Sequence, residues 1–234
     1  MADRKATVLV IEDEPEIRRF LRASFDAEDY RVVEAATGRR GTIDAGSHKP
    51  DLAIVDLALP DMDGVEVIRN IRQWSPMPII VLSARVQERA KIEALDAGAN
   101  DYVTKPFGVG ELLARVRAAL RHAVQPPTGN TVLRLGRVRV DLEKRSATRE
   151  GGEVRLTPIE FRLLGVLAHH LDMVVTHRQL LTEVWGPSHA SDTHYLRVYM
   201  KQLRDKLEDD PVQPKHLLTE TGVGYRLVAD PEAG

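Results

Sequence analysis

Side chains that could carry out phosphoryl chemistry follow the ends of short apolar segments in the N-terminal half of the chain. Clustered carboxylates repel one another, a divalent cation relieves that repulsion, and oxygen ligands without histidine or cysteine suit Mg²⁺. A carboxylate beside Mg²⁺ can attack a phosphoryl group, while a hydroxyl and an ammonium hold the phosphoryl oxygens. The residues that would supply this chemistry are Glu12, Asp13, Asp56, Ser83 and Lys105.

The elements that must position these residues alternate between strand and helix. This alternation predicts βαβ units and a five-stranded parallel sheet in a doubly wound α/β fold. In such sheets ligands bind at the carboxyl ends of the strands, which is where the acids, the serine and the lysine fall. The predicted strands are residues 8–11, 31–34, 52–55, 79–82 and 101–103. The predicted helices are residues 14–29, 38–45, 65–73, 87–97 and 110–122.

Length and composition limit the class of protein. A chain of 234 residues, 43% hydrophobic and 29% charged, fits one or two globular domains. Cysteine is absent, which excludes disulfides, cysteine-based zinc sites and a thiol nucleophile, and favours a cytoplasmic location. No apolar run approaches about 18 residues, so neither a membrane-spanning helix nor a membrane partner is expected.

An uncharged segment at residues 124–130, with two prolines and a glycine, predicts a linker. It separates an N-terminal domain at 1–123 from a C-terminal domain at 131–234. In the second domain, short antiparallel strands are predicted at 133–134, 138–141, 147–149 and 153–156. Helical segments follow at 158–170, 176–185 and 192–207, and then a hairpin at 217–228. Thr157 as N-cap, Pro158 at the first helical position and Glu160 at the third predict the start of the first helical segment.

The last of these helical segments presents two faces. An apolar seam, with spacings of 4, 3 and 4 residues, consists of Leu196, Met200, Leu203 and Leu207. A basic stripe on a neighbouring face consists of His194, Arg197, Lys201 and Arg204. Such a stripe, on a helix preceded by a helix and a turn, is typical of a recognition helix in the DNA major groove. An ordinary solvated charged face is the alternative.

Four motifs in the N-terminal half resemble the receiver domain of bacterial response regulators. They are Glu12-Asp13, residues 56–64, Ser83-Ala84 and residues 98–107. The resemblance implies that Asp56 accepts a phosphoryl group from a phosphohistidine on a sensor histidine kinase. It also implies that Lys105 and Ser83 act at the phosphoryl group, and that Ser83 and Tyr102 form a switch pair.

The same resemblance implies a Mg²⁺ site. Asp13, Asp56 and the Ala58 main-chain carbonyl would bind the ion, and Glu12 would act through water. Glu12 departs from the family pattern, in which aspartate is common at this position.

Residues 156–164, 178–186, 203–208 and 221–227 resemble the winged helix-turn-helix effector of the OmpR/PhoB subfamily. The resemblance implies a transcription regulator that binds promoter DNA and RNA polymerase. Within the subfamily, residues 194–208 and 214–226 are most similar to regulators of a potassium-transport operon, which pair with a dedicated sensor kinase. The candidate DNA-contacting residues are His194, Arg197, Tyr199, Lys201, Arg204, Thr221, Tyr225 and Arg226. Thr221 departs from the subfamily, where many members carry a minor-groove arginine.

The resemblance to receiver domains also implies a homodimer. Its interface would consist of the predicted helices 87–97 and 110–122 and the predicted strand 101–103. The expected intersubunit ion pairs are Lys91–Glu111, Asp96–Arg117 and Asp101–Arg115. Asn100 and His122 stand where the subfamily usually has aspartate and arginine. The further intersubunit ion pair that the subfamily forms between these two positions is therefore not expected in this chain.

Two other function classes remain open. A phosphatase of the haloacid-dehalogenase type also uses a Mg²⁺-assisted aspartate, but it needs a second acid two residues on, where this chain has Ala58. That argues against a turnover enzyme. A signalling scaffold that binds only protein is the other alternative, and it would lack salt-dependent DNA binding.

Three local features near the predicted site have structural interpretations. Asp61 and Asp63 are predicted to form turns rather than bind metal, and Leu59 at the first ligand position excludes a calcium loop. The Lys105–Pro106 bond permits a cis peptide that would turn the lysine inward.

Overall fold

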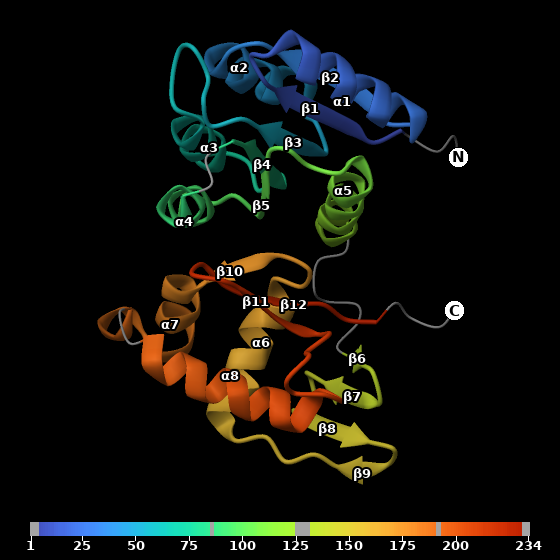
Figure 1. Ribbon diagram of the computed structural model, residues 1–234, viewed down its shortest axis with the longest axis vertical. Coiled ribbons are helices and arrows are strands. Elements are labelled where there is room, and N and C mark those ends of the chain that lie inside the picture. Colours follow the sequence, from blue (N-terminus) through green and yellow to red (C-terminus); the bar gives the residue numbers. More distant parts are fainter. Residues whose placement is uncertain (1–4, 85–86, 125–131, 191–192, 231–234) are drawn as a thin grey trace. The chain divides into compact units, whose positions relative to one another are not determined.

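The computed structural model of the protein describes residues 5–84, 87–124, 132–190 and 193–230 (Figure 1). The chain divides into two compact units, Met1–Val124 and Gln125–Gly234. Val124 is the last residue of a helix, and residues 125–130 of the predicted linker lie outside the described ranges. No helix among the described residues is long and apolar enough to cross a membrane.

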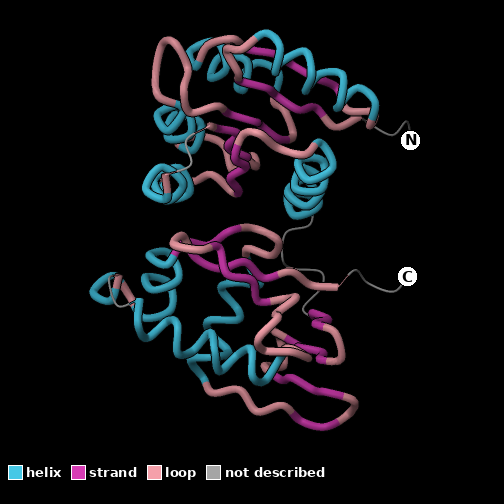
Figure 2. Tube along the Cα trace, viewed as in Figure 1, coloured by secondary structure: helices cyan, strands magenta, loops and turns pink. Residues whose placement is uncertain are grey.

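The N-terminal unit alternates strands and helices along its length (Figure 2). All of its strands are parallel, and the sheet order is β2-β1-β3-β4-β5, which confirms the doubly wound α/β prediction. Its strands are β1 (Thr7–Ile11), β2 (Arg31–Ala35), β3 (Leu52–Val55), β4 (Ile79–Ser83) and β5 (Asp101–Thr104). Its helices are α1 (Pro15–Ala27), α2 (Gly38–His48), α3 (Gly64–Arg72), α4 (Glu88–Asp96) and α5 (Val109–Val124).

Alternation within the strands builds a core on each face of this sheet. Side chains at every second position, such as Val8 and Val10 in β1, join Leu21 and Phe25 of α1 and residues of α5 in one buried cluster. The intervening residues, such as Leu9, are buried on the opposite side, because successive side chains of a strand point to opposite faces. A sheet covered on both faces leaves the ends of its strands as the accessible place for a polar site.

The C-terminal unit contains two antiparallel sheets around three α-helices (Figure 1). The first sheet has the order β6-β7-β8-β9, from β6 (Val132–Leu135), β7 (Val138–Asp141), β8 (Ser146–Arg149) and β9 (Gly152–Glu153). The second has the order β10-β12-β11, from β10 (Val174–Thr176), β11 (Leu217–Glu220) and β12 (Gly224–Leu227). The helices are α6 (Pro158–His169), α7 (His177–Trp185), the short 3₁₀ helix η1 (Pro187–His189) and α8 (Thr193–Leu207).

Two helices of this unit begin as their sequences predict. Thr157 accepts a hydrogen bond from the Glu160 amide, and the Glu160 carboxylate accepts one from the Thr157 amide, which forms a capping box at the start of α6. Thr176 and Gln179 form the same arrangement at the start of α7. These caps fix where the two helices that precede α8 begin.

Strand β10 is absent from the sequence predictions. Its three residues are too few to show a period, and they form a strand because they pair with β12, with Val175 opposite Tyr225. Gly224 permits this pairing, since a Cβ there would lie 2.0 Å from the Val175 carbonyl oxygen. The predicted strand at 153–156 is also shorter than expected, because only Gly152 and Glu153 pair with β8.

Candidate functional site

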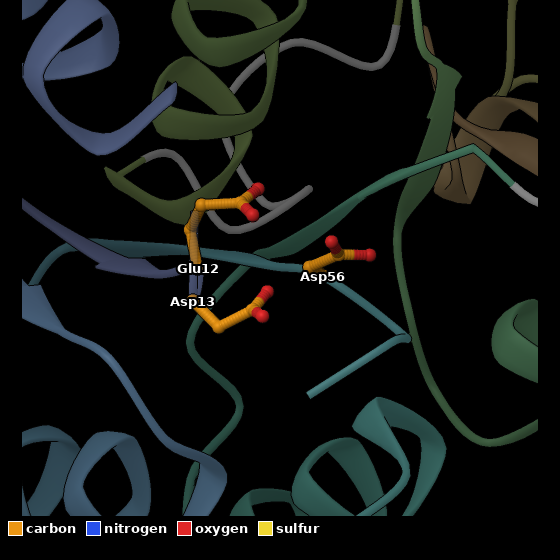
Figure 3. Close-up of side chains that lie close together, drawn as sticks. All are labelled: Glu12, Asp13 and Asp56. Atoms are coloured by element: carbon orange, nitrogen blue, oxygen red, sulfur yellow. The ribbon is translucent and has the colours of Figure 1, made fainter. Parts of the chain in front are cut away.

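Three carboxylates meet at the carboxyl ends of β1 and β3 (Figure 3). Parallel pairing sets Ile11 opposite Val55, so the next residues, Glu12 and Asp56, lie beside each other. One ligand oxygen from each of Glu12, Asp13 and Asp56 lies within 4.8 Å of the others. Glu12 and Asp56 are buried, with 1% and 4% of their surface exposed. This set of oxygen donors fits Mg²⁺.

Lys105 supplies the positive charge at this acidic cluster. Its Nζ lies 2.8 Å from Asp56 Oδ2 and 2.8 Å from Glu12 Oε2. Burial alone would lower the pKa of Lys105, but its contacts with these two carboxylates raise the pKa above its usual value. Burial also raises the pKa of Glu12, an effect that Asp56 increases and Lys105 opposes. The Lys105–Pro106 peptide is cis, as the sequence allows.

The loop that follows β3 contacts the Asp56 carboxylate. Ala58 donates its amide to Asp56 Oδ1 at 3.2 Å, so the Ala58 main chain lies beside the acidic cluster. Asp63 caps α3 by accepting from the Val65 amide, and Asp61 accepts from two amides at the start of α2. Asp61 and Asp63 thus hold the loop and the neighbouring helix ends, as the turn-forming interpretation predicts, rather than joining the carboxylate cluster.

Ser83 and Tyr102 lie on adjacent strands near the same sheet edge. Ser83 is fully buried at the end of β4 and is paired in register with Thr104 of β5. Tyr102 is 8% exposed, and Lys91 of α4 places its Nζ 5.5 Å from the centre of the tyrosine ring. The Tyr102 side chain is therefore buried, and its ring lies against Lys91 of α4.

A second candidate site lies in the C-terminal unit, between α8 and the β11–β12 hairpin. The apolar seam of α8 is buried as predicted, at Leu196, Met200, Leu203 and Leu207. His194, Arg197 and Lys201 are exposed on the neighbouring face. A groove of about 350 Å³ lies beside α8 and the hairpin, and its lining includes Arg197, Lys201, Thr219 and Thr221. Two exposed cations beside a groove suit a polyanion such as DNA.

Comparisons with known proteins match both units. Residues 8–117 match the family described as "Response regulator receiver domain", and residues 151–227 match "Transcriptional regulatory protein, C terminal". The chain is 54% identical to the KDP operon transcriptional regulatory protein KdpE of Escherichia coli, covering 94% of this chain and 98% of that protein. It is 50% identical to the transcriptional regulatory protein KdpE of Mycobacterium tuberculosis, covering 95% and 99%.

The chain is a DNA-binding response regulator of the OmpR/PhoB type. Among solved structures, a CheY-like response regulator receiver domain protein of Methanospirillum hungatei aligns with a TM-score of 0.50 and 25% identity. That alignment covers 52% of this chain and 98% of the other. The resemblances to receiver and winged-helix proteins, and to the potassium-operon regulators, are therefore confirmed.

Two of the predicted DNA contacts of this response regulator lie in its interior. Tyr225 is 5% exposed and packs 5.5 Å from the His177 ring, and burial raises the pKa of its hydroxyl. Arg226 is 7% exposed, pairs with Glu220 at 3.0 Å, and donates to the Asp172 carbonyl at 2.7 Å. These side chains hold the hairpin together, and Tyr225 also lines the groove beside α8. Contact of Tyr225 and Arg226 with DNA stays a prediction.

Two further predicted contacts are engaged inside the effector unit. Arg204 donates to the Leu217 carbonyl at 2.9 and 2.6 Å and to the Thr219 hydroxyl at 2.7 Å. Tyr199 is half-buried, with its ring 5.4 Å from that of Trp185. Arg204 thereby ties α8 to β11, and its truncation would remove contacts that the sequence pattern did not reveal.

Residues predicted for the dimer face form ion pairs within the chain. Arg115 lies 2.7 Å from Asp101 and 2.8 Å from Glu111, and Arg117 lies 3.4 Å from Glu28. An intersubunit Asp101–Arg115 or Lys91–Glu111 pair would have to exchange with these internal pairs.

Asn100, one of the departures from the subfamily pattern, accepts hydrogen bonds that an aspartate could also accept, so these bonds do not explain the departure. Its Oδ1 accepts from the Ile79 amide at 2.8 Å and from Arg72 Nη2 at 3.0 Å. Arg72 also donates to main-chain carbonyls, including that of Gly98, and burial lowers its pKa to about 10. Asn100 therefore links the start of β4 to the end of α3.

Sequence reasoning missed three residues beside the two sites. Arg18 of α1 donates to the main-chain carbonyls of Glu12 and Asp13. Tyr195 and Val198 of α8 are 62% and 43% exposed next to the basic stripe. Helical spacing indicates Val198, which lies four residues after His194 and three before Lys201, whereas no sequence signal indicates which carbonyls Arg18 contacts.

Proposed function

We propose that this response regulator accepts a phosphoryl group on Asp56 from a sensor histidine kinase of the KdpD type. The observation that carries the proposal is the buried Asp56 carboxylate beside Glu12, Asp13 and Lys105. An Asp56 oxygen attacks phosphorus, the bond from phosphorus to the kinase imidazole breaks, and the imidazole leaves with that electron pair. The product is an aspartyl phosphate.

The residues around Asp56 have distinct parts in this reaction. Glu12, Asp13 and Asp56 would hold Mg²⁺, with the Ala58 carbonyl as a further ligand. When bound, Mg²⁺ supplies charge neutralisation at the phosphoryl oxygens. Lys105, already 2.8 Å from Asp56, takes up an oxygen of the phosphoryl group as an ion pair. The Ser83 hydroxyl turns toward the phosphoryl group and donates a hydrogen bond to a second phosphoryl oxygen. Tyr102 then shifts in response to the movement of Ser83.

A labelling experiment tests this assignment. In the presence of a small-molecule phosphodonor and Mg²⁺, the wild-type chain should incorporate acid-labile phosphate, and Asp56→Ala should incorporate none. Asp61→Asn is the matched control, because Asp61 lies in the same loop and should label at the wild-type rate. A chelator should stop labelling. Labelling of Asp56→Ala at the wild-type rate would exclude this acceptor.

We further propose that phosphorylation drives dimerisation through α4, β5 and α5, and that the dimer binds promoter DNA and engages RNA polymerase in the cytoplasm. The regulated gene set is a potassium-transport operon, a proposal supported by the identity of 50–54% to two KdpE proteins. Arg197, Lys201, His194 and Thr221 line the DNA-facing side of α8 and the hairpin. The chain is proposed to act as a regulator and not as a turnover phosphatase.

Footprinting tests the DNA part. The wild-type chain, with and without a phosphodonor, is incubated with the promoter of the potassium-transport operon from the same organism. Protection that strengthens with the phosphodonor and weakens with salt supports the proposal. Protection that is absent at every salt concentration favours a scaffold that binds protein alone.

A further inference from the structure

Arg18 contacts the acidic loop through main-chain oxygens. Its Nη1 lies 2.7 Å from the Glu12 carbonyl and 2.6 Å from the Asp13 carbonyl. No carboxylate among the described residues forms an ion pair with Arg18, although the two residues that it contacts are both acidic. A guanidinium favours carboxylates as partners, so its use on two consecutive carbonyls indicates a role in fixing the main chain.

The loop that Arg18 holds is restrained from several sides. Upstream, the Glu12 amide donates to the Ala35 carbonyl at 3.0 Å, which fixes the end of β1 against β2. Downstream, the Glu14 amide lies 3.3 Å from Glu12 Oε1. Between these two hydrogen bonds, Arg18 holds the main-chain carbonyls of Glu12 and Asp13. Without it, both Glu12 and Asp13 gain freedom where β1 ends.

We propose that Arg18 is a positioning residue for the Mg²⁺ site, and that it sets the affinity of the site for the ion. By holding both carbonyls, Arg18 keeps the carboxylates of Glu12 and Asp13 directed toward Asp56, within the 4.8 Å spread of ligand oxygens. Residues that orient metal ligands typically contribute about 10–100-fold to metal affinity. This inference rests on the proposed use of Mg²⁺ in phosphoryl transfer.

The experiment compares the full-length Arg18→Met variant with the wild type. Methionine keeps an unbranched stem of similar length but cannot donate. Mg²⁺ affinity is measured from amide shifts in an NMR titration with MgCl₂, and phosphodonor labelling is measured over the same range of Mg²⁺. In Arg18→Met, half-saturating Mg²⁺ should rise roughly tenfold in both measurements. The labelling rate at saturating Mg²⁺ should match the wild type, because Asp56 and Lys105 are intact.

Two further variants separate positioning from charge and from folding. Arg19→Met removes the same charge from an exposed neighbour on α1 and should leave half-saturation unchanged. Arg18→Lys retains a donor nitrogen and should recover at least part of the affinity. If Arg18→Met does not fold, Arg18→Leu, which also lacks a donor, replaces it in the same comparison.

The outcomes distinguish this inference from the proposed function. An Arg18→Met variant with wild-type half-saturation, or an Arg19→Met variant with the same shift as Arg18→Met, overturns the positioning role. A wild-type chain that binds Mg²⁺ but takes no phosphate overturns the proposed phosphoacceptor. In that case, the NMR affinities still decide the part that Arg18 plays.

Discussion

Lys105 is the single residue whose charge most directly balances the acidic site. It is 11% exposed on its side chain and contacts two carboxylates that are buried with it. Loss of one partner from a buried ion pair leaves an uncompensated charge and typically costs about 3–5 kcal/mol. Lys105→Met should therefore lower the free energy of unfolding by about 3 kcal/mol in a chelator at pH 7.

Urea unfolding of the full-length chain measures this effect, and added Mg²⁺ should restore part of the loss by binding the same carboxylates. Lys5→Met is the control, because Lys5 pairs with Asp29 on the surface and both side chains are more than half exposed. A lysine in an exposed pair contributes about 0–1 kcal/mol. Equal losses in the two variants would show that Lys105 is not a buried partner.

Glycine is required at position 64 because the main chain of Asp56 and Leu57 lies directly against it. A Cβ at Gly64 would lie 2.1 Å from the Asp56 carbonyl oxygen and 2.7 Å from Leu57 Cα, and neither can move without shifting β3. Gly64→Ala should destabilise the fold by about 3 kcal/mol and slow phosphate labelling. In Gly108→Ala, the new Cβ meets no atom within 4 Å, so urea unfolding of this control should match the wild type.

At the scale of elements, Glu160 joins the start of α6 to α8. Its carboxylate is 1% exposed and lies 2.7 Å from Lys206 Nζ, and it also accepts from the Thr157 amide. Burial alone would raise the pKa of Glu160, but the bonds from Lys206 and Thr157 lower it below the ordinary 4.5. A lowered pKa contributes stability above pH 4.5 that is lost as the pH falls through the folded-state value.

Glu160→Gln keeps the capping box and removes the charge. At pH 7, this variant should be less stable by about 1 kcal/mol, and the difference from the wild type should shrink as the pH falls below the ordinary value of 4.5. The chain has two tryptophans, so Trp185 fluorescence in a Trp74→Phe background follows the C-terminal unit alone. A difference that stays constant from pH 7 to about pH 2 would contradict the lowered pKa.

Arg204 links α8 to the β11–β12 hairpin, and these contacts change the expected effect of truncating Arg204. The spacing of α8 predicts that removing Arg197, Lys201 and Arg204 together leaves stability unchanged. Because Arg204 donates three hydrogen bonds to β11, Arg204→Ala should instead cost about 2 kcal/mol. Arg197→Ala should stay within about 0.5 kcal/mol of the wild type, since Arg197 is exposed.

The two variants should also differ in DNA binding. Arg197→Ala should reduce the salt dependence of operator binding by about one counterion. Arg204→Ala should loosen the hairpin, which hydrogen exchange at the β11 amides would report as faster exchange. Unchanged exchange and unchanged stability in Arg204→Ala would show that the helix and hairpin are held by other contacts.

At the scale of the whole molecule, the proposed dimer face contains residues that already pair within one chain. Arg115 contacts both Asp101 and Glu111, so it orders the β5–α5 face and also carries a charge that a second copy could share. With a phosphodonor, the wild-type chain should sediment as a dimer. Arg115→Ala should still label on Asp56 but dimerise at least several-fold more weakly, because rim charges set the orientation of the two copies.

Arg22→Ala provides the control for the dimer measurement, since Arg22 is an exposed charge on α1 that pairs with Glu34. It should dimerise like the wild type. If Arg115→Ala dimerises normally, the proposed face or the proposed exchange of ion pairs is incorrect.

The sequence alone determined most of the elements, because they depend on local patterns, and it placed the acids at strand ends. Short segments of three or four residues, most of them apolar, predicted the five parallel strands, and the carboxyl ends of these strands placed Glu12, Asp13 and Asp56 at one edge of the sheet. Thr157 and Glu160 predicted the start of α6, since a capping box needs only neighbouring residues. The seam from Leu196 to Leu207 likewise predicted the buried face of α8.

Only the tertiary structure decided which side chains of these elements are free to act. Helical spacing places Arg197 and Arg204 on one stripe, but the hairpin covers the Arg204 end and leaves Arg197 exposed. Tyr225 and Arg226 are buried because β12 is the central strand of its sheet. Arg18, near the start of α1, donates to the Glu12 and Asp13 carbonyls that follow β1. Each outcome depends on contacts between different elements, which the period of a single element does not determine.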